Sequence, residues 1–275
     1  MRANAAIQHP VALLNGPLLR LPDAATLRQV FHLKYGTETQ LGWGPKLRRD
    51  HGYSTPDDVY EALLASLCVK GLRWLDIGCG RELCPSNPSL AKLLAQRVGR
   101  LVGLDPDPTL DENPYVHEKI KAPIDGYESE ERFDLVTLRM VAEHIDDPEA
   151  CVRGMVKALA PGGLAIVYTV FAASPMPLLT RLAPMGLRHT VKRFLWRTDQ
   201  KDTFPTRFRM NTRGRLQRLF GAHGLREEAF LRLDDCRTFS RFRWLLLCEL
   251  RVRTFFRALG MPYPEHCILG AYRKP

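Results

Sequence analysis

The stretch Trp74-Leu75-Asp76-Ile77-Gly78-Cys79-Gly80 decides the fold of this chain of 275 residues. It starts in a short apolar run and ends in an acid and two glycines, which predicts a buried strand that enters a tight turn. A helix is predicted next, because Asn87 can cap it, Pro88 suits its first position, and leucines recur at helical spacing up to Val98. A strand, a glycine turn and a helix in this order are typical of nucleotide-binding α/β proteins.

The alternation of strand and helix continues after this turn. Strands are predicted at 101–105, 133–139 and 164–170, and a helix capped by Asp147 precedes the last of them. This pattern predicts a doubly wound α/β fold, in which helices cover both faces of a parallel sheet. Further helices are expected at 23–34, 55–71, 211–224 and 241–259, and two final strands at 225–233 and 267–272.

Prolines and glycines divide the chain into four expected segments. Residues 1–54 form an N-terminal extension or cap with a glycine-rich break at 36–44, and residues 55–170 form the cofactor-binding core. Residues 171–210 contain four prolines and lose the periodic pattern, so we expect a helical lid insertion that binds the acceptor. Residues 211–275 complete the core sheet and add one helix.

The net charge of +10 comes from the C-terminal part of the chain. Residues 1–170 contain 19 Lys and Arg against 22 Asp and Glu, whereas residues 171–275 contain 21 against 8. Seven cysteines without a C-x-x-C pair argue against a disulfide framework or a zinc site, so we predict no metal and a reducing, cytoplasmic location. No secretory signal is recognised, and prolines and glycines interrupt the uncharged stretch 158–180, which argues against a membrane-spanning helix.

Two strand ends supply groups that suit a nucleoside cofactor. The turn at 78–80 lets the backbone approach a ligand closely, and Asp105 ends the next strand, where its two oxygens can accept hydrogen bonds from both hydroxyls of a ribose. A dinucleotide is disfavoured, because Leu83 stands in place of a third glycine and Asp76 would repel a pyrophosphate. Asp76 suits a cationic methionyl amine instead. The residues therefore favour S-adenosylmethionine over a nicotinamide cofactor.

These motifs resemble those of the class I S-adenosylmethionine-dependent methyltransferases that act on small molecules. The resemblance extends over about residues 55–170 and rests on Trp74-Leu75-Asp76-Ile77-Gly78-Cys79-Gly80, Val102-Gly103-Leu104-Asp105, Phe133-Asp134-Leu135-Val136 with Glu143-His144-Ile145, and Leu159-Ala160-Pro161-Gly162-Gly163. The family implies a Rossmann-like sheet of seven strands in the order 3-2-1-4-5-7-6, with the last strand antiparallel. It also implies that Gly78 and Gly80, with Cys79 between them, face the methionyl part of the cofactor, and that Asp105 holds the ribose.

The segment after the fourth strand is expected to lie beside the reacting groups. Arg139 and Met140 are candidate walls of the cofactor pocket. His144 is a candidate general base, because histidine exchanges a proton readily near neutral pH and could deprotonate an acceptor hydroxyl. The alternative is that His144 begins a helix and satisfies backbone groups, since proximity can largely supply an in-line methyl transfer.

Two basic stretches are open to more than one interpretation. Arg207 and Arg209 belong to a basic series over 192–218 and are expected on the inner side of the lid, where their guanidinium groups would suit a carboxylate or phosphate of the acceptor. The alternatives are a solvated basic face and nucleic-acid binding, which is disfavoured because no RNA module is present. Residues 241–259 combine arginines with leucines and aromatic residues, which is typical of a core or dimer helix, or of a helix with at most peripheral membrane contact.

The residues predict an S-adenosylmethionine-dependent methyltransferase that O-methylates a small molecule, such as a sugar or a lipid-linked metabolite. An anionic acceptor is left open. An RNA methyltransferase and a catalytically silent cofactor-binding regulator are the alternatives. The acceptor's identity and the oligomeric state are not predicted.

Overall fold

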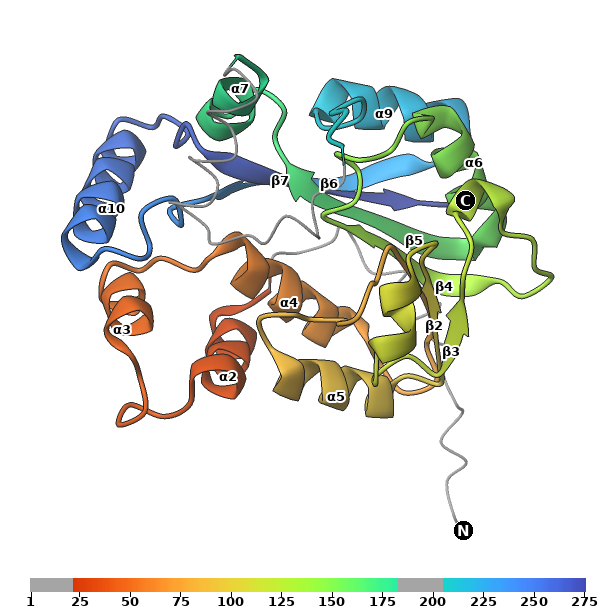
Figure 1. The fold of residues 1–275 in the computed structure, drawn as a ribbon, viewed down its shortest axis with the longest axis horizontal. Coiled ribbons are helices and arrows are strands. Elements are labelled where there is room, and N and C mark those ends of the chain that lie inside the picture. Colours follow the sequence, from red (N-terminus) through yellow and green to blue (C-terminus); the bar gives the residue numbers. More distant parts are fainter. Residues whose placement is uncertain (1–21, 183–204) are drawn as a thin grey trace, which may run out of the picture.

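A seven-stranded sheet forms the centre of the computed structural model, which describes residues 22–182 and 205–275 (Figure 1). The strands lie in the order β3-β2-β1-β4-β5-β7-β6, and β7 runs antiparallel to both of its neighbours. The predicted fold class and sheet order are thus confirmed. The strands are β1 (Arg73–Ile77), β2 (Arg100–Leu104), β3 (Glu118–Ile120), β4 (Phe133–Arg139), β5 (Leu159–Val170), β6 (Arg226–Asp234) and β7 (His266–Arg273).

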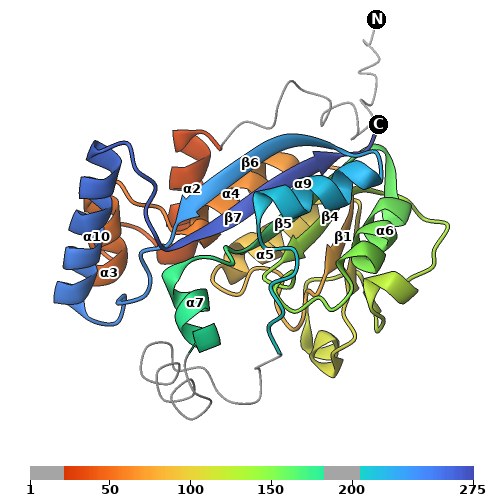
Figure 2. The ribbon, with the colours of Figure 1, turned by 90° about the horizontal axis from the view of Figure 1, so that it is seen from above.

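Helices cover both faces of the sheet (Figures 1 and 2). On one face lie α2 (Ala24–Tyr35), α4 (Pro56–Leu67) and α5 (Pro88–Arg97), and on the other α6 (Pro148–Ala158) and α9 (Arg213–Ala222). Successive side chains of a strand point to opposite faces, so Trp74 joins the first core and Leu75 the second. Because both faces are buried, the central strands consist largely of apolar residues.

The helices that flank the glycine turn begin at the caps that the sequence indicates. Thr55 and Asp58 form a reciprocal capping box, with the Thr55 hydroxyl accepting from the Asp58 amide at 3.2 Å and the Asp58 carboxylate accepting from the Thr55 amide at 2.9 Å. Asn87 accepts from the Leu90 amide at 3.1 Å. Asp147 caps α6 in the same way.

The N-terminal extension contains a helix that the sequence prediction missed. A break was expected at 36–44, but α3 (Trp43–Asp50) begins directly after Gly42. Gly44 and Pro45 fall in its first turn, where Pro is tolerated and Gly does little harm. α3 packs against α10 (Arg243–Ala258), and the cluster between them consists of Leu47, Tyr53, Cys236, Leu246, Leu250 and Tyr263.

Three other regions differ from the sequence prediction or go beyond it. β3 is short and polar and was not predicted; two 3-10 turns, η1 (Pro108–Glu112) and η2 (Ile124–Gly126), flank it. β5 begins at Leu159, five residues before the predicted start of this strand at 164, so Pro161-Gly162-Gly163 lies inside it. Of the predicted lid at 171–210, the structure describes residues 171–182, which include α7 (Pro175–Leu182), and residues 205–210. Residues 183–204 lie outside the described part, so the lid remains a prediction.

Candidate functional site

The turn after β1 has a backbone that glycine favours. Gly78 and Gly80 have φ angles of 67° and 49°, in the left-handed region that side chains disfavour. A Cβ atom on Gly78 would lie 2.3 Å from Cγ2 of Val141, so this position has no room for a side chain. A Cβ atom on Gly80 would approach only Oδ2 of Asp105, at 4.0 Å. The backbone at Gly80 therefore faces open space beside a carboxylate, which is the cradle that a nucleoside ligand requires.

Asp105 sits at the end of β2 and is held by the backbone. Its Oδ2 accepts from the Gly80 amide and its Oδ1 from the Asp107 amide, both at 2.8 Å. Each carboxylate oxygen has room for a second hydrogen bond, so two ribose hydroxyls can still be bound. Asn113 supports the same turn by donating to the Gly80 carbonyl at 3.0 Å. The position and orientation of Asp105 thus fit the predicted role.

Asp76 is buried in the sheet beside β4. The Thr137 hydroxyl donates to Oδ1 of Asp76 at 2.5 Å, and the Trp74 indole donates to that hydroxyl at 2.6 Å. Burial raises the pKa of Asp76 to about 7, although the Thr137 hydrogen bond and the charge of Arg139 act in the opposite direction. A cationic group near Asp76 would compensate for the burial of its charge, as expected for a methionyl amine.

Arg139 and Met140 lie at the end of β4. Burial disfavours the charge of Arg139, yet the carboxylate of Asp57, 4.0 Å away, and the other acidic groups nearby hold its pKa above the usual value. Met140 has a φ of 52°, which is rare for a residue with a side chain, and its amide donates to the Tyr168 carbonyl at 2.8 Å. This strained backbone redirects the chain from the strand toward His144.

Cys79 has a packing role in the turn. Its side chain is buried against Gly103 of β2, where an added Cβ would lie 2.7 Å from the sulfur. Burial raises the pKa of this thiol, so the thiolate form is disfavoured. Cys79 thus contributes its backbone, not a reactive sulfur, to the turn in which it was predicted.

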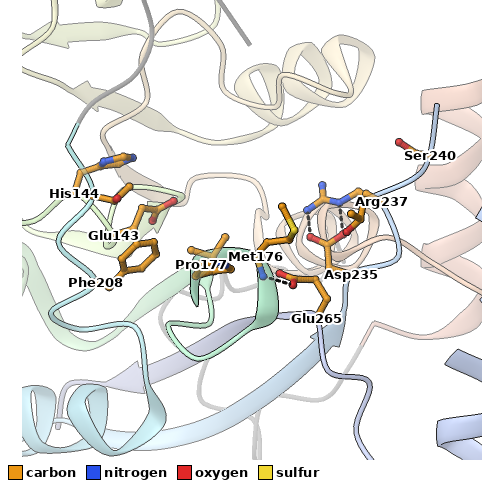
Figure 3. A pocket seen from close by; sticks show the side chains of 12 residues that line it. Glu143, His144, Met176, Pro177, Phe208, Asp235, Arg237, Ser240 and Glu265 are labelled. Atoms are coloured by element: carbon orange, nitrogen blue, oxygen red, sulfur yellow. Dashed lines mark hydrogen bonds and ion pairs between the residues drawn. The ribbon is translucent and has the colours of Figure 1, made fainter. Parts of the chain in front are cut away.

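A pocket of about 530 Å³ lies farther along the same edge of the sheet, near the carboxyl ends of β4, β5 and β6 (Figure 3). Its described lining does not include Asp76, Gly78, Gly80, Asp105, Arg139 or Met140. The amino end of β7 lies at the same edge, because β7 is antiparallel. Ligands of doubly wound proteins bind outside the carboxyl ends of strands. The pocket is lined by Glu143, His144, Val170, Met176, Pro177, Thr206, Phe208, Asp235, Arg237, Thr238, Ser240 and Glu265.

Three carboxyl groups and one guanidinium group line the described part of this pocket. Asp235 pairs with Arg237 through both of its oxygens, at 2.6 and 2.7 Å. Glu143 accepts from the Thr169 hydroxyl at 2.7 Å. Glu265 accepts from the Met176 amide at 2.9 Å, and burial raises its pKa to about 7. The positive charge of Arg237 is therefore already balanced by carboxylates.

His144 lines the pocket and points toward its interior in the same region as Glu143 and Phe208 (Figure 3). Its Nδ1 lies 3.0 Å from the Pro205 carbonyl. A carbonyl only accepts, so this contact places the proton on Nδ1 and the lone pair of the neutral ring on Nε2. The ring thus contacts the backbone, as the alternative interpretation expected, although His144 lies in a turn and does not begin a helix. Its role as general base remains a prediction.

Arg207 and Arg209 flank the pocket without lining it. Nε of Arg207 lies 2.8 Å from Oδ1 of Asp146, and Arg209 donates to the Asp146 carbonyl. Both side chains are exposed, whereas their neighbours Thr206 and Phe208 line the cavity. The substrate role of the two arginines remains a prediction.

Sequence reasoning missed several residues that the fold brings to the site. Glu143 directly precedes His144 in a motif that carried the resemblance, so its position was detectable. Asp57, Arg237 and Glu265 gave no local signal, because they meet only through packing of distant segments. In the described part of the chain, no cluster of three or more His, Cys, Asp or Glu side chains has a metal-binding arrangement. Within those residues, no helix is long and apolar enough to cross a membrane.

The sheet order, the glycine turn and the acid at the end of β2 define a Rossmann-like protein of the class I methyltransferase type. Residues 48–228 match a family model described as "Methyltransferase domain", and the chain belongs to that family.

Curated relatives share part of the chain. A protein named "Ubiquinone biosynthesis O-methyltransferase" from Xanthomonas oryzae pv. oryzae is 31% identical over 144 residues, which cover 46% of this chain and 57% of that one. The mitochondrial protein of that name from Schizosaccharomyces pombe is 24% identical over 202 residues, covering 66% of this chain and 71% of its own length. The chain thus spans little more than half the length of the Xanthomonas relative.

Two solved structures resemble this chain at low sequence identity. The N-methyltransferase NodS from Bradyrhizobium japonicum WM9 is 17% identical, with a TM-score of 0.47 and coverage of 84% of this chain and 97% of that one. Magnesium protoporphyrin IX methyltransferase from Synechocystis PCC 6803 is 15% identical, with a TM-score of 0.47 and coverage of 91% and 95%.

Proposed function

We propose that the protein is an S-adenosylmethionine-dependent methyltransferase that methylates a hydroxyl group of a small molecule. One observation carries this proposal: the cradle formed by Gly80 and Asp105 lies at the same carboxyl edge of the parallel strands as the pocket beyond β4, β5 and β6. Asp105 would hold the ribose and Asp76 the methionyl amine. The bound cofactor would supply an electrophilic methyl group. The names of the curated relatives support O-methylation as the reaction.

His144 fits the role of a general base in this reaction. Its Nε2 would accept the proton of the acceptor hydroxyl while the hydroxyl oxygen forms a bond to the methyl carbon and the bond from carbon to sulfur breaks. The Pro205 carbonyl fixes the ring tautomer that this step needs. Glu143 and Phe208 lie beside the ring and would position the acceptor.

The charges of the pocket favour an acceptor without a negative group. Asp235, Glu143 and Glu265 line it, and Arg237 is already paired with carboxylates. An anionic acceptor would lose its hydration among these acids. The described residues that line the pocket offer no cation beyond the paired Arg237 to compensate for that loss. A pocket of about 530 Å³ also suits a small molecule better than an RNA strand. All seven cysteines are free thiols, which supports a cytoplasmic site of action.

The proposal is tested in two stages. Calorimetry should detect binding of S-adenosylmethionine and its demethylated product; binding of nicotinamide dinucleotides in their place would overturn the assignment. A cell extract is then separated by anion exchange into neutral and anionic metabolites, and each pool is incubated with a methyl-labelled donor. Label should be transferred to the neutral pool. Transfer only to the anionic pool would contradict the proposed acceptor charge, and a product stable to O-demethylating acid would contradict the hydroxyl.

A further inference from the structure

α10 has a second apolar face that the described chain leaves exposed. Its inner face, with Leu246 and Leu250, packs on α3 and the loops around Tyr53. At 3.6 residues per turn, a different set of apolar residues falls within an arc of about 100° on the outer side. Trp244 is 77% exposed and Phe255 is 61% exposed. The outer face, which we call the α10 stripe, consists of Trp244, Leu245, Cys248, Val252, Phe255 and Leu259.

The exposed charges of α10 and of the residues directly before it are all positive. Glu249 is the one carboxylate of α10, and it is buried, where it accepts hydrogen bonds from Tyr263 and the Phe239 amide. Arg253 turns inward and pairs with Asp234 at 2.8 Å. The exposed cations of α10 and of the residue pair before it are Arg241, Arg243, Arg251 and Arg257, of which Arg251 borders the stripe.

A second copy of the chain fits this surface poorly. A two-fold dimer through the stripe would place the arginines of both copies together, and α10 offers no exposed carboxylate to pair with them. In such a dimer the arginines of the two copies would repel each other. A lipid surface that carries phosphate groups would instead attract the arginines, and its interfacial region would accept the tryptophan and phenylalanine rings.

We propose that α10 docks on the surface of an anionic lipid bilayer. The stripe would enter the boundary between headgroups and acyl chains, and the arginines would contact lipid phosphates. α10 lies at one end of the molecule, far from β2 and the glycine turn, so docking leaves the cofactor edge accessible (Figures 1 and 2).

The loop that leads to α10 connects this surface with the pocket. Thr238 and Ser240 line the pocket, while Phe239 and Phe242 are 38% and 37% exposed in the same loop. Docking through α10 would therefore bring the pocket close to the bilayer, where a lipid-linked acceptor could enter. The docking itself does not depend on the proposed methyl transfer, because it rests on the surface of α10 alone.

The test is co-sedimentation of the full chain with vesicles of phosphatidylcholine alone or with one third phosphatidylglycerol. We expect the wild-type protein to bind the anionic vesicles. Its affinity for them should fall at least tenfold in half-molar salt, and the affinities of W244S/F255S and R251E/R257E should each be at least tenfold lower than that of wild type. Two matched controls replace exposed residues elsewhere: L178S/L179S on α7 and R215E/R218E on α9. Both should retain most of the binding, and circular dichroism should show equal folding of all four variants.

Three results would overturn the inference. The first is equal binding to both vesicle types, or to neither. The second is a loss in R215E/R218E as large as that in R251E/R257E, which would indicate general charge attraction. The third is a wild-type dimer in analytical ultracentrifugation that dissociates in W244S/F255S, which would make the stripe an interface between copies.

Discussion

Arg237 and Asp57 are 180 positions apart in the chain and form an ion pair that joins the loop after β6 to the first turn of α4. Asp57 also accepts from the Tyr168 hydroxyl at 2.9 Å and faces Arg139. Burial alone would raise the pKa of Asp57, but the two arginines outweigh it and hold the pKa below its usual value. The pocket lined by Arg237 and the surroundings of Asp76 therefore share one network of charges.

Replacing Arg237 should destabilise the protein. Arg237→Ala leaves Asp57 and Asp235 without their cation, and removal of one partner of a fully buried pair costs about 3–5 kcal/mol. The Arg237 side chain is 28% exposed, so we expect a smaller loss of about 2 kcal/mol in urea unfolding. Arg237→Lys keeps the charge but loses the bidentate contact with Asp235, so its unfolding free energy should lie between those of wild type and the alanine variant. An alanine variant as stable as wild type would show that water replaces the pair fully.

A side chain at Gly78 should disrupt the turn. In Gly78→Ala the new Cβ would lie 2.3 Å from Val141, at a φ of 67°. We expect a loss of at least about 2 kcal/mol in unfolding free energy and little cofactor binding. Gly214→Ala is the matched control, because nothing lies within 4 Å of its Cβ in α9, and it should stabilise the protein by about 0.5–1 kcal/mol. Equal effects of the two substitutions would contradict the geometry.

Asp105 should determine cofactor affinity. Asp105→Ala removes the acceptors for the ribose and leaves the Gly80 amide unpaired, for an expected loss of about 1–3 kcal/mol in binding, or up to about 100-fold in Kd. Calorimetry with the demethylated cofactor measures this change. Glu82→Ala, an exposed site in the following loop, serves as the control and should bind as wild type does. A normal Kd in Asp105→Ala would remove this residue from the site.

Asp76 should make stability and cofactor binding respond to pH in opposite directions. Its pKa rises from 3.8 to about 7 on folding, so the folded state holds the proton more tightly. The stability from protonated Asp76 is therefore present at low pH and is lost as pH rises from about 4 to about 7. Urea unfolding should be measured at pH 5 and pH 8. The unfolding free energy of Asp76→Asn, relative to that of wild type, should be higher at pH 8 than at pH 5.

Cofactor binding should show the reverse trend in wild type, because a methionyl ammonium needs the ionised carboxylate. Affinity is expected to rise with pH through about 7, and Asp76→Asn should lack this rise. A rise retained in the asparagine variant would assign the titration to another group.

His144 should affect turnover more than binding. His144→Gln removes the acceptor nitrogen of the proposed base but can still donate to the Pro205 carbonyl. We expect kcat to fall by about 10²–10⁴, with the Kd for cofactor within twofold. A fall of tenfold or less would support the purely structural role of the ring.

The parts of the fold that the sequence predicted correctly are those with local signals. The caps Thr55, Asn87 and Asp147 mark helix starts through hydrogen bonds within three residues, and the apolar strands follow from burial on both faces. β3 was missed because a three-residue strand with two charged residues has no such pattern.

The pocket was harder to predict than the cofactor turn for the same reason. Gly78, Gly80 and Asp105 belong to two adjacent strand ends with a recognisable spacing. Asp57 and Arg237, in contrast, meet only after α4 and the loop beyond β6 have packed together. The predicted arginines of the lid pair with Asp146 outside the cavity, because residues 206 and 208 take the positions that face it.

The antiparallel direction of β7 has a consequence for how this protein can change. Because β7 returns along β6, the Asp235 amide donates to the Glu265 carbonyl at 2.9 Å, so the two ends of the connection meet. Residues 236–264 therefore form a closed excursion from the sheet, which supplies one wall of the pocket and the whole of α10. Changes within residues 236–264 would therefore leave the register of β6 and β7 and the turn after β1 intact, provided that an arginine still pairs with Asp57. Such changes would alter one wall of the pocket and the outer face of α10 together, without altering Gly80 or Asp105.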